Sequence, residues 1–222
     1  MLRNPSYAAL TGPHASFAEV RGNAVAYPSD VAPFCGVPAE PTAQDWADLA
    51  ALLGPGRRGA TMRPAPALPE SLKLVDQFDL VQFVAPEGLA APDAEAVALT
   101  VDDVPDMIAL VALTDPGPFR PRTIELGPYL GIREGGELIA MAGVRKTLSA
   151  YAEISAVCTH PDHRGRGLAR RLIGAVAAEI TATGRRPFLH TGGTNTTAQR
   201  LYSALGFTVT NRMHVTIVEP AG

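Results

Sequence analysis

One stretch restricts the fold of this chain more than any other: a strand pattern that passes through a glycine-rich turn into a long amphipathic helix. The strand is YAEISAVCTH (151–160), and the turn HPDHRGRG (160–167) follows at once. Apolar residues then recur at helical spacing on two adjacent rows, which are Leu168, Leu172, Val176 and Ile180, and Ala169, Ile173 and Ala177. Gly184 ends the helix pattern.

The start of this helix is suited to bind an anion. The first four N–H groups of a helix have no partner within it, and the helix dipole makes that end positive. Gly165 and Gly167 lack side chains that would hold a phosphate away from the backbone, while Arg164 and Arg166 add positive charge. No Gly-Lys-Ser/Thr follows, and Arg170 replaces the third glycine of a dinucleotide fingerprint. From this stretch alone, a helix start with solvated arginines is an equally good interpretation.

Regular alternation of strand and helix patterns begins near residue 93. The other elements expected in this part are a strand (96–100), a helix (101–114) capped by Asp102 or Asp103, a proline-rich loop (114–122), a hairpin (128–134 and 137–147) turning at Gly135-Gly136, a strand (187–191), a helix (196–205) and a terminal hairpin (207–218). This mixed order predicts an α+β fold, with a mixed β-sheet flanked by helices.

Residues 1–92 have a different character, because twelve of the 20 prolines lie there. We expect a loop-rich α/β extension with a helix over 43–53 and one or two strands over 72–84. The proline-rich stretch 54–70 is predicted to be loop, including the formal GxGxxG at its start, which follows a helix rather than a strand. The sequence thus predicts two parts, an extension (1–92) and a main domain (93–222).

Composition excludes several classes of protein. A net charge of −3 and a pI near 5.9 argue against a nucleic-acid binder. No apolar run approaches membrane-spanning length, and the first residues lack a signal-peptide pattern. Cys35 and Cys158 form neither a disulfide framework nor a metal-ligand cluster, which fits a reducing cytoplasm. We therefore expect a cytoplasmic protein without a metal.

Two motifs in a fixed order resemble the GNAT superfamily of acyl-CoA-dependent N-acetyltransferases. R-x-x-G-x-(G/A), read here as Arg164, Gly167 and Ala169, follows the strand EISAVCTHPD. About 25 residues later comes NTTAQRLYSALGF, whose spacing of Asn195, Ala198, Leu201, Tyr202, Gly206 and Phe207 is a further marker of that family. The resemblance covers roughly residues 93–218. It implies a GNAT-like acyltransferase fold and transfer of an acetyl group from acetyl-CoA to a primary amine.

The resemblance also implies how the cosubstrate lies. The pyrophosphate of CoA would rest on Arg164, Gly165, Arg166, Gly167, Leu168 and Ala169. The pantetheine arm would pair with Val157 to Thr159, where two neighbouring strands splay apart and leave backbone groups free. Asn195 would contact the same arm, although N-capping of the next helix also explains this residue. Many members have glycine where this chain has Ala169.

Acetyl transfer to an amine needs a base, an oxyanion donor and an acid. Glu153 is the preferred base, because strict alternation would place it on the same side of the sheet as Val157, and His160 and His190 are rivals. By resemblance, the backbone N–H near Val157 stabilises the oxyanion. Tyr202 can protonate the leaving thiolate, because a phenol is protonated at neutral pH. A carboxylate at a strand edge and a core tyrosine are the plain alternatives.

The sequence is compatible with three functions. An N-acetyltransferase requires Tyr202 together with Glu153 or a water chain, whereas a CoA-binding sensor without turnover requires only the anion site. A thiol-dependent acyl hydrolase would depend on Cys158, but this residue has opposite parity to Val157 and is expected to be a buried small hydrophobe.

The acceptor and the role of the extension are predicted only in outline. The acceptor is a small-molecule or peptide amine, whose pocket the resemblance places between residues 115–122 and 208–214. Residues 1–92 either complete that pocket, as a degenerate GNAT-like partner domain, or form a homodimer contact. They carry no second phosphate motif.

Overall fold

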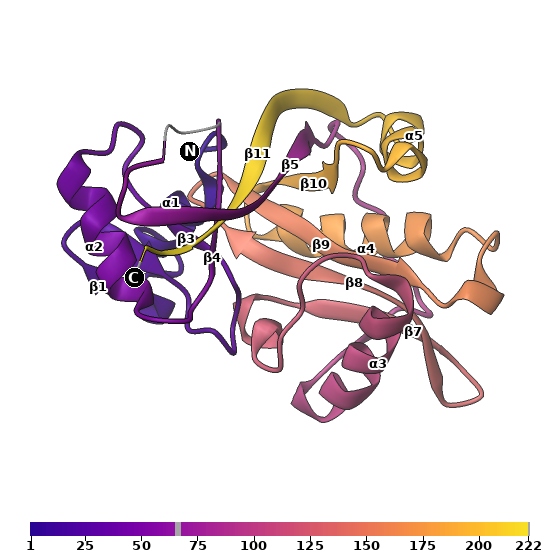
Figure 1. Cartoon of the computed structure of the whole chain (residues 1–222). Coiled ribbons are helices and arrows are strands. Elements are labelled where there is room, and N and C mark those ends of the chain that lie inside the picture. Colours follow the sequence, from indigo (N-terminus) through magenta and orange to yellow (C-terminus); the bar gives the residue numbers. More distant parts are fainter. Residues whose placement is uncertain (65–67, 222) are drawn as a thin grey trace.

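A computed structural model describes residues 1–64 and 68–221 (Figure 1). In this part of the chain the main sheet has eight strands in the order β4-β11-β5-β10-β9-β8-β7-β6. Their bounds, in that order, are Gly59–Arg63, Thr208–Pro220, Leu72–Val84, Arg186–Gly192, Tyr151–Thr159, Glu137–Thr147, Tyr129–Glu134 and Val97–Ala98. The pair β9–β10 is parallel and the other neighbours are antiparallel. The predicted mixed sheet is confirmed.

Helices and the N-terminal part cover both faces of this sheet. Helix α4 (Leu168–Ala182) buries its apolar stripe on one face, and α5 (Thr196–Ala204) follows β10. Helix α3 (Val104–Thr114) packs on the opposite face over β8 and β9. Helix α1 (Pro5–Leu10) lies on the same face as α3, because Phe188 packs with Ala9 whereas the next residue of β10, Leu189, packs toward α4.

The remaining N-terminal elements form a small layer beside the sheet. Strands β1 (Glu19–Arg21), β2 (Ala24–Ala26) and β3 (Cys35–Gly36) make a separate sheet against helix α2 (Ala43–Leu53). Thr42 and Asp45 close the start of α2 with a reciprocal capping box. The helix predicted over 43–53 is therefore confirmed. Among the residues that the structure describes, none of the helices combines the length and apolar character that a membrane crossing requires.

The structure differs from the predictions at two strands. The terminal hairpin predicted over 207–218 is wrong, because β11 is one strand that pairs with β5 on one side and with β4 on the other. Part of the loop predicted over 54–70 is strand β4, while residues 65–67 of that loop lie outside the described residues. Strands β4 and β5 precede residue 93, so the main sheet takes strands from both sides of the predicted boundary.

Candidate active site

The candidate site is built around two β-bulges at the centre of the sheet. Between the pairs Gly143↔Ser155 and Met141↔Cys158, β8 advances two residues and β9 advances three. The extra residue of β9 is accommodated at Ala156, which has φ of 52°, a conformation uncommon for a non-glycine residue. A bulge of this kind shifts the alternation of side chains by one residue.

This shift overturns one prediction. Val157 packs toward α4, on the same side as Ile154. Glu153 precedes Ile154 and points to the opposite face, so Glu153 and Val157 do not share a side as strict alternation predicted. Cys158 packs against α3, opposite to Val157, and is 6% exposed. The prediction that Cys158 is a buried small hydrophobe is confirmed, and burial raises the pKa of its thiol to about 11.

Strands β9 and β10 separate just before this bulge. Their parallel pairing runs from Tyr151↔Arg186 to Ile154↔Leu189. Beyond that point β10 pairs with β5 alone, through Gly192↔Leu80. Within the described residues, the edge of β9 that faces β10 is thus without a strand partner over residues 155–159. Val157 and Thr159, predicted to pair with the pantetheine arm, lie on this open segment and are half-buried.

The glycine-rich turn lies at the end of the same strand. Gly165 and Gly167 have φ of 78° and 75°, and a Cβ added to either would meet nothing within 4 Å. Gly167 is the N-cap of α4, and the first backbone N–H within the helix to find a partner is that of Arg171, which donates to the carbonyl of Gly167 at 3.1 Å. The N–H groups just before it are therefore left for a ligand or for water.

The other residues of this turn differ in how they can contact an anion. Leu168 is 3% exposed and its side chain lies in the core, so only its backbone can contact a ligand. Ala169 is half-buried. Arg166 forms an ion pair with Glu134 at 2.5 Å. Arg164 is exposed and has no ion pair with a described residue, which leaves its guanidinium available to an anion.

Two predicted residues belong to the segment after β10: Asn195 is the N-cap of α5, and Tyr202 lies within this helix. The Oδ1 atom of Asn195 accepts a hydrogen bond from the backbone N–H of Ala198 at 3.0 Å, so this residue does cap the helix. Tyr202 is 7% exposed, and its ring meets Phe83 edge-on with centroids 5.7 Å apart. Burial raises the pKa of Tyr202 to about 12, so its hydroxyl keeps its proton at neutral pH.

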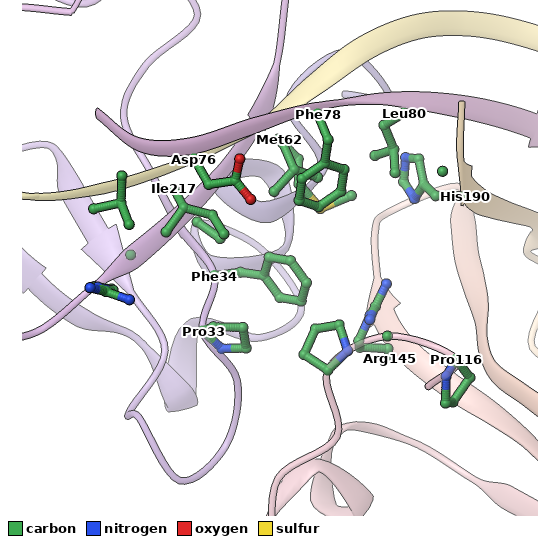
Figure 2. A pocket seen from close by; sticks show the side chains of 18 of the residues that line it. Pro33, Phe34, Met62, Asp76, Phe78, Leu80, Pro116, Arg145, His190 and Ile217 are labelled. Carbon is green, nitrogen blue, oxygen red and sulfur yellow. The ribbon is translucent and has the colours of Figure 1, made fainter. Parts of the chain in front are cut away.

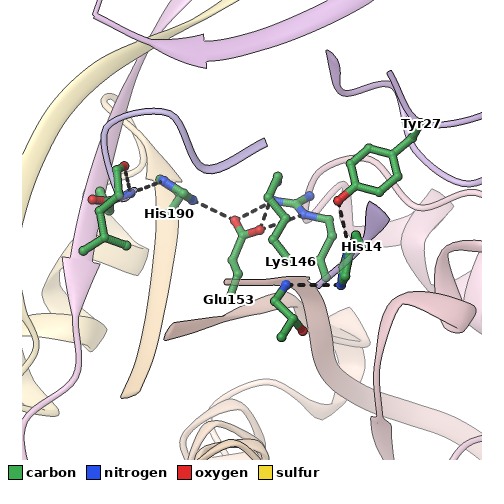
Figure 3. Close-up of polar contacts among 9 residues, drawn as sticks. His14, Tyr27, Lys146, Glu153 and His190 are labelled. Carbon is green, nitrogen blue, oxygen red and sulfur yellow. Dashed lines mark hydrogen bonds and ion pairs between the residues drawn. The ribbon is translucent and has the colours of Figure 1, made fainter. Parts of the chain in front are cut away.

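Glu153 is the centre of a buried ionic cluster (Figure 3). Its carboxylate accepts hydrogen bonds from Arg145 at 2.9 Å, from Lys146 at 3.0 Å and from His190 at 2.7 Å. Arg145 and Lys146 both reach this carboxylate because of an irregularity in the pairing of β8 with β9. Between the pairs Val144↔Ile154 and Thr147↔Ala152, β8 advances three residues and β9 advances two. This second bulge turns two consecutive side chains of β8 toward one carboxylate.

The cluster sets the charge states of its members. Burial alone would raise the pKa of Glu153, but Arg145, Lys146 and His190 outweigh it and hold that pKa well below the usual value. Burial, aided by the charge of Arg145, lowers the pKa of Lys146 against the opposing effect of Glu153. Such a carboxylate is a poor proton acceptor, so the geometry supports a positioning role, while the predicted role of Glu153 as base stays a prediction.

The hydrogen-bond network also fixes the tautomer of His190. The Nε2 atom of Gln82 donates to the backbone carbonyl of Leu2 at 2.9 Å, which identifies it as the amide nitrogen. The same atom lies 2.8 Å from Nε2 of His190, which must therefore accept. The proton of His190 is then on Nδ1 and is donated to Glu153. His190 is neutral and both of its ring nitrogens are occupied, which does not suit a free base.

The second rival base, His160, has a structural contact. Its Nδ1 atom accepts from the backbone N–H of Asp162 at 3.3 Å and caps the short helix Pro161–His163. His160 therefore shapes the glycine-rich turn.

A cavity of about 720 Å³ lies on the face of the sheet that carries the ionic cluster (Figure 2). Its walls come from the N-terminal part, from residues 116–120 and from β11, and β10 contributes His190 to Gly192. The loop predicted to frame the acceptor pocket, 115–122, does line it. Strand β11 contributes Val215 and Ile217, just beyond the predicted 208–214. Sequence reasoning did not identify Arg145 and Phe34, which also line this cavity.

Comparison with known proteins identifies the family. The FR47-like protein model matches residues 129–215. A GNAT-family structure from Novosphingobium aromaticivorans has 35% sequence identity to this chain, covers 100% of it and 99% of its own length, and superimposes with a TM-score of 0.91. The chain belongs to the GNAT family.

More distant solved structures share the fold. A GCN5-related N-acetyltransferase from Kribbella flavida has 20% identity and a TM-score of 0.60, and the match covers 98% of this chain and 95% of that one. A functionally unknown conserved protein from Staphylococcus epidermidis has 12% identity and a TM-score of 0.60, with 91% and 93% covered. Curated protein sequences give no match. GNAT membership supports acyl transfer as the general reaction.

Cys158→Ala is expected to change stability rather than chemistry. Removing a buried sulfur leaves a small cavity, which costs about 1 kcal/mol of unfolding free energy. Turnover per folded molecule with an accepted amine should match the wild type. Cys35→Ala, which removes the second buried thiol far from the strand bulge, is the matched control. An acetyl group trapped on Cys158 by acetyl-CoA alone would contradict this expectation and favour the acyl hydrolase.

Proposed function

We propose that this GNAT protein transfers the acetyl group of acetyl-CoA directly to a primary amine bound in the cavity of Figure 2. The observation that carries the proposal is the open edge of β9. It connects the glycine-rich turn to the point where β10 leaves, and β10 lines the cavity with His190, Thr191 and Gly192. A cosubstrate along this edge and an amine in the cavity approach the same gap in the sheet.

The residues of the chain then take distinct roles. The free N–H groups after Gly167, with Arg164 and Arg166, hold the pyrophosphate. Val157 and Thr159 offer backbone groups to the pantetheine arm, and Asn195 retains an amide N–H for the same arm. The backbone at the Ala156 bulge is the donor for the oxyanion that forms when the amine attacks the thioester carbonyl.

Proton transfers complete the reaction. The amine nitrogen loses one proton as its bond to the acetyl carbon forms, and Tyr202 protonates the sulfur as the C–S bond breaks. Glu153 and His190 are engaged with each other and with their neighbours. A water chain that carries the first proton from the amine to bulk solvent is therefore the simplest path. Because neither candidate base is free, a CoA-binding sensor without turnover is the second candidate function.

The cosubstrate site can be tested with a matched pair of glycine variants. Gly167 and Gly184 flank α4, have φ of 75° and 74°, and leave open space beside an added Cβ. Alanine at either position should cost a similar 1–2 kcal/mol of stability, because both are in the left-handed conformation. Only Gly167→Ala places a methyl group in the proposed phosphate path, so it should weaken acetyl-CoA binding by ~10-fold or more.

Calorimetry on both folded variants gives the answer. The wild type and Gly184→Ala should bind one acetyl-CoA per chain with equal affinity, since residues 1–92 carry no second phosphate motif. Equal affinity of Gly167→Ala would remove the glycine-rich turn from the binding site. Screening amines for release of the free CoA thiol then separates the acetyltransferase from the sensor, because only the transferase releases thiol in the presence of an amine.

A further inference from the structure

The cavity of Figure 2 contains a buried arginine with one donor group unused. Arg145 is 8% exposed, and its Nη2 and Nε atoms donate to Glu153 at 2.9 and 3.3 Å. No described residue accepts a hydrogen bond from its Nη1 atom. That atom faces the loop that lines the cavity, since a Cβ added to Gly117 would lie 3.9 Å from it. A guanidinium held in this way is preorganised to bind an acceptor group in the cavity.

The charge balance around Arg145 favours an anion there. Arg145 and Lys146 share the single carboxylate of Glu153. His190 is neutral by its hydrogen bonds, and burial lowers the pKa of nearby His14 to about 4, so it is also neutral at pH 7. Burial lowers the pKa of Lys146 to about 7, so the cluster carries one excess positive charge below that pH and approaches neutrality above it. An unpaired buried charge is costly, and a carboxylate against Nη1 would offset it.

The rest of the cavity is suited to an apolar group. Its walls include six large apolar side chains, which are Phe34, Met62, Phe78, Leu80, Val215 and Ile217. Phe78 is 44% exposed, unusually open for an aromatic ring. Asp76 and two further arginines, Arg58 and Arg120, also line the cavity. Apolar walls with a few convergent polar groups are typical of a small-molecule site.

We infer that the acceptor is an amino acid with a large apolar side chain, whose carboxylate binds Nη1 of Arg145. This inference rests on the proposed acetyl transfer. Arg145 contacts the cluster that includes His190, and His190 to Gly192 border the gap where the thioester arrives. A carboxylate and an amine on one α-carbon fit this arrangement, because Arg145 and His190 are joined through the one carboxylate of Glu153 and line the same cavity. The apolar side chain then occupies the wall around Phe34 and Phe78.

Matched ligands test the inference on the wild-type protein. The probes are L-phenylalanine, its amide, and phenethylamine, which lacks the carboxylate. With acetyl-CoA, L-phenylalanine should have a kcat/KM roughly 10- to 100-fold above both others, the scale of one hydrogen bond to a charged group. Equal or better turnover of phenethylamine would overturn the inference and leave the acetyltransferase intact.

A binding measurement separates the inference from the proposed function. Calorimetry without acetyl-CoA should show N-acetyl-L-phenylalanine binding roughly 10-fold or more tightly than its amide. If this preference holds but no amine is acetylated, the carboxylate site at Arg145 stands, while acetyl transfer and the assignment of an amino acid as acceptor both fail. If the amide binds equally well, or neither compound binds, the carboxylate site is overturned.

A variant assigns the effect to Arg145. Arg145→Gln removes the free donor and should bring the three amines within about 3-fold of one another, because a neutral hydrogen bond replaces a charge-assisted one. Arg133→Gln is the matched control, since Arg133 also pairs with carboxylates but lies away from the cavity. It should keep the wild-type preference. An unchanged preference in folded Arg145→Gln overturns the assignment, and if that variant does not fold, the comparison of ligands on the wild type decides.

Discussion

Tyr202→Phe is expected to lower turnover by ~100-fold or more, the usual scale for the loss of a positioned general acid. The variant removes one oxygen and keeps the ring, so packing against Phe83 and Phe207 persists and acetyl-CoA affinity should be nearly unchanged. The loss should appear in kcat and in kcat/KM alike, because the proton is needed only as the C–S bond breaks. Steady-state kinetics with an accepted amine provide the measurement.

Tyr151→Phe is the control for Tyr202→Phe. Tyr151 also stacks edge-on against a phenylalanine, Phe188, but lies at the other end of β9. It should retain wild-type turnover. If Tyr202→Phe also turns over like the wild type, Tyr202 is only a core aromatic, and the thiolate receives its proton from water.

Glu153→Gln is expected to have the largest effect on stability. The amide keeps the shape of the side chain but removes the charge that compensates Arg145 and Lys146, both of them buried. Breaking a buried ion pair in this way typically costs about 3–5 kcal/mol of unfolding free energy. Urea unfolding of the wild type and the variant at pH 7 measures the difference directly.

An exposed ion pair provides the comparison for Glu153→Gln. Glu125 pairs with Arg122 at 2.7 Å, but both side chains are more than 40% exposed. Glu125→Gln should therefore cost less than about 1 kcal/mol. If Glu153→Gln has a similarly small cost, the loss of the carboxylate charge is already offset, either by water that solvates the cations or by deprotonation of Lys146. Adding Lys146→Met to Glu153→Gln should recover part of the loss, because it removes one of the two unpaired cations.

Much of the main domain could be predicted because its signals are local. The hairpin β7–β8 is marked by Gly135-Gly136, and α4 by an apolar stripe between Gly167 and Gly184. The predicted burial of Cys158, on the side opposite to Val157, is also confirmed. These features depend on periodicity and on residues with special backbone freedom, and both are visible in the sequence.

The errors arise where pairing between distant segments decides the structure. Nothing local distinguishes one long strand over 208–220 from a hairpin, because the choice depends on its pairing with β4 and β5. The bulge at Ala156 is equally hidden, since alanine carries no preference for a positive φ. It reversed the predicted side of Glu153 relative to Val157.

The buried cluster was missed for a similar reason. Arg145 and Lys146 are adjacent in the sequence, a pattern that ordinarily indicates an exposed strand edge. One signal could have found them: both follow an unbroken apolar run, LIAMAGV (138–144), which is expected to be central in the sheet. Their pairing with Glu153 still required the bulge in β8, which only the register shows.

The strand order of the main sheet has a consequence for how the chain folds. Residues 59–63 pair with 214–218, and β5 lies between β10 and β11, so the outer half of the sheet joins segments far apart in the sequence. Contacts of such separation slow folding, because a large loop must close before they form. During synthesis, β4 and β5 wait with open edges until β10 and β11 have left the ribosome. In that interval the apolar residues of β5 are exposed to aggregation, and a chaperone that shields this strand would raise the yield of folded protein.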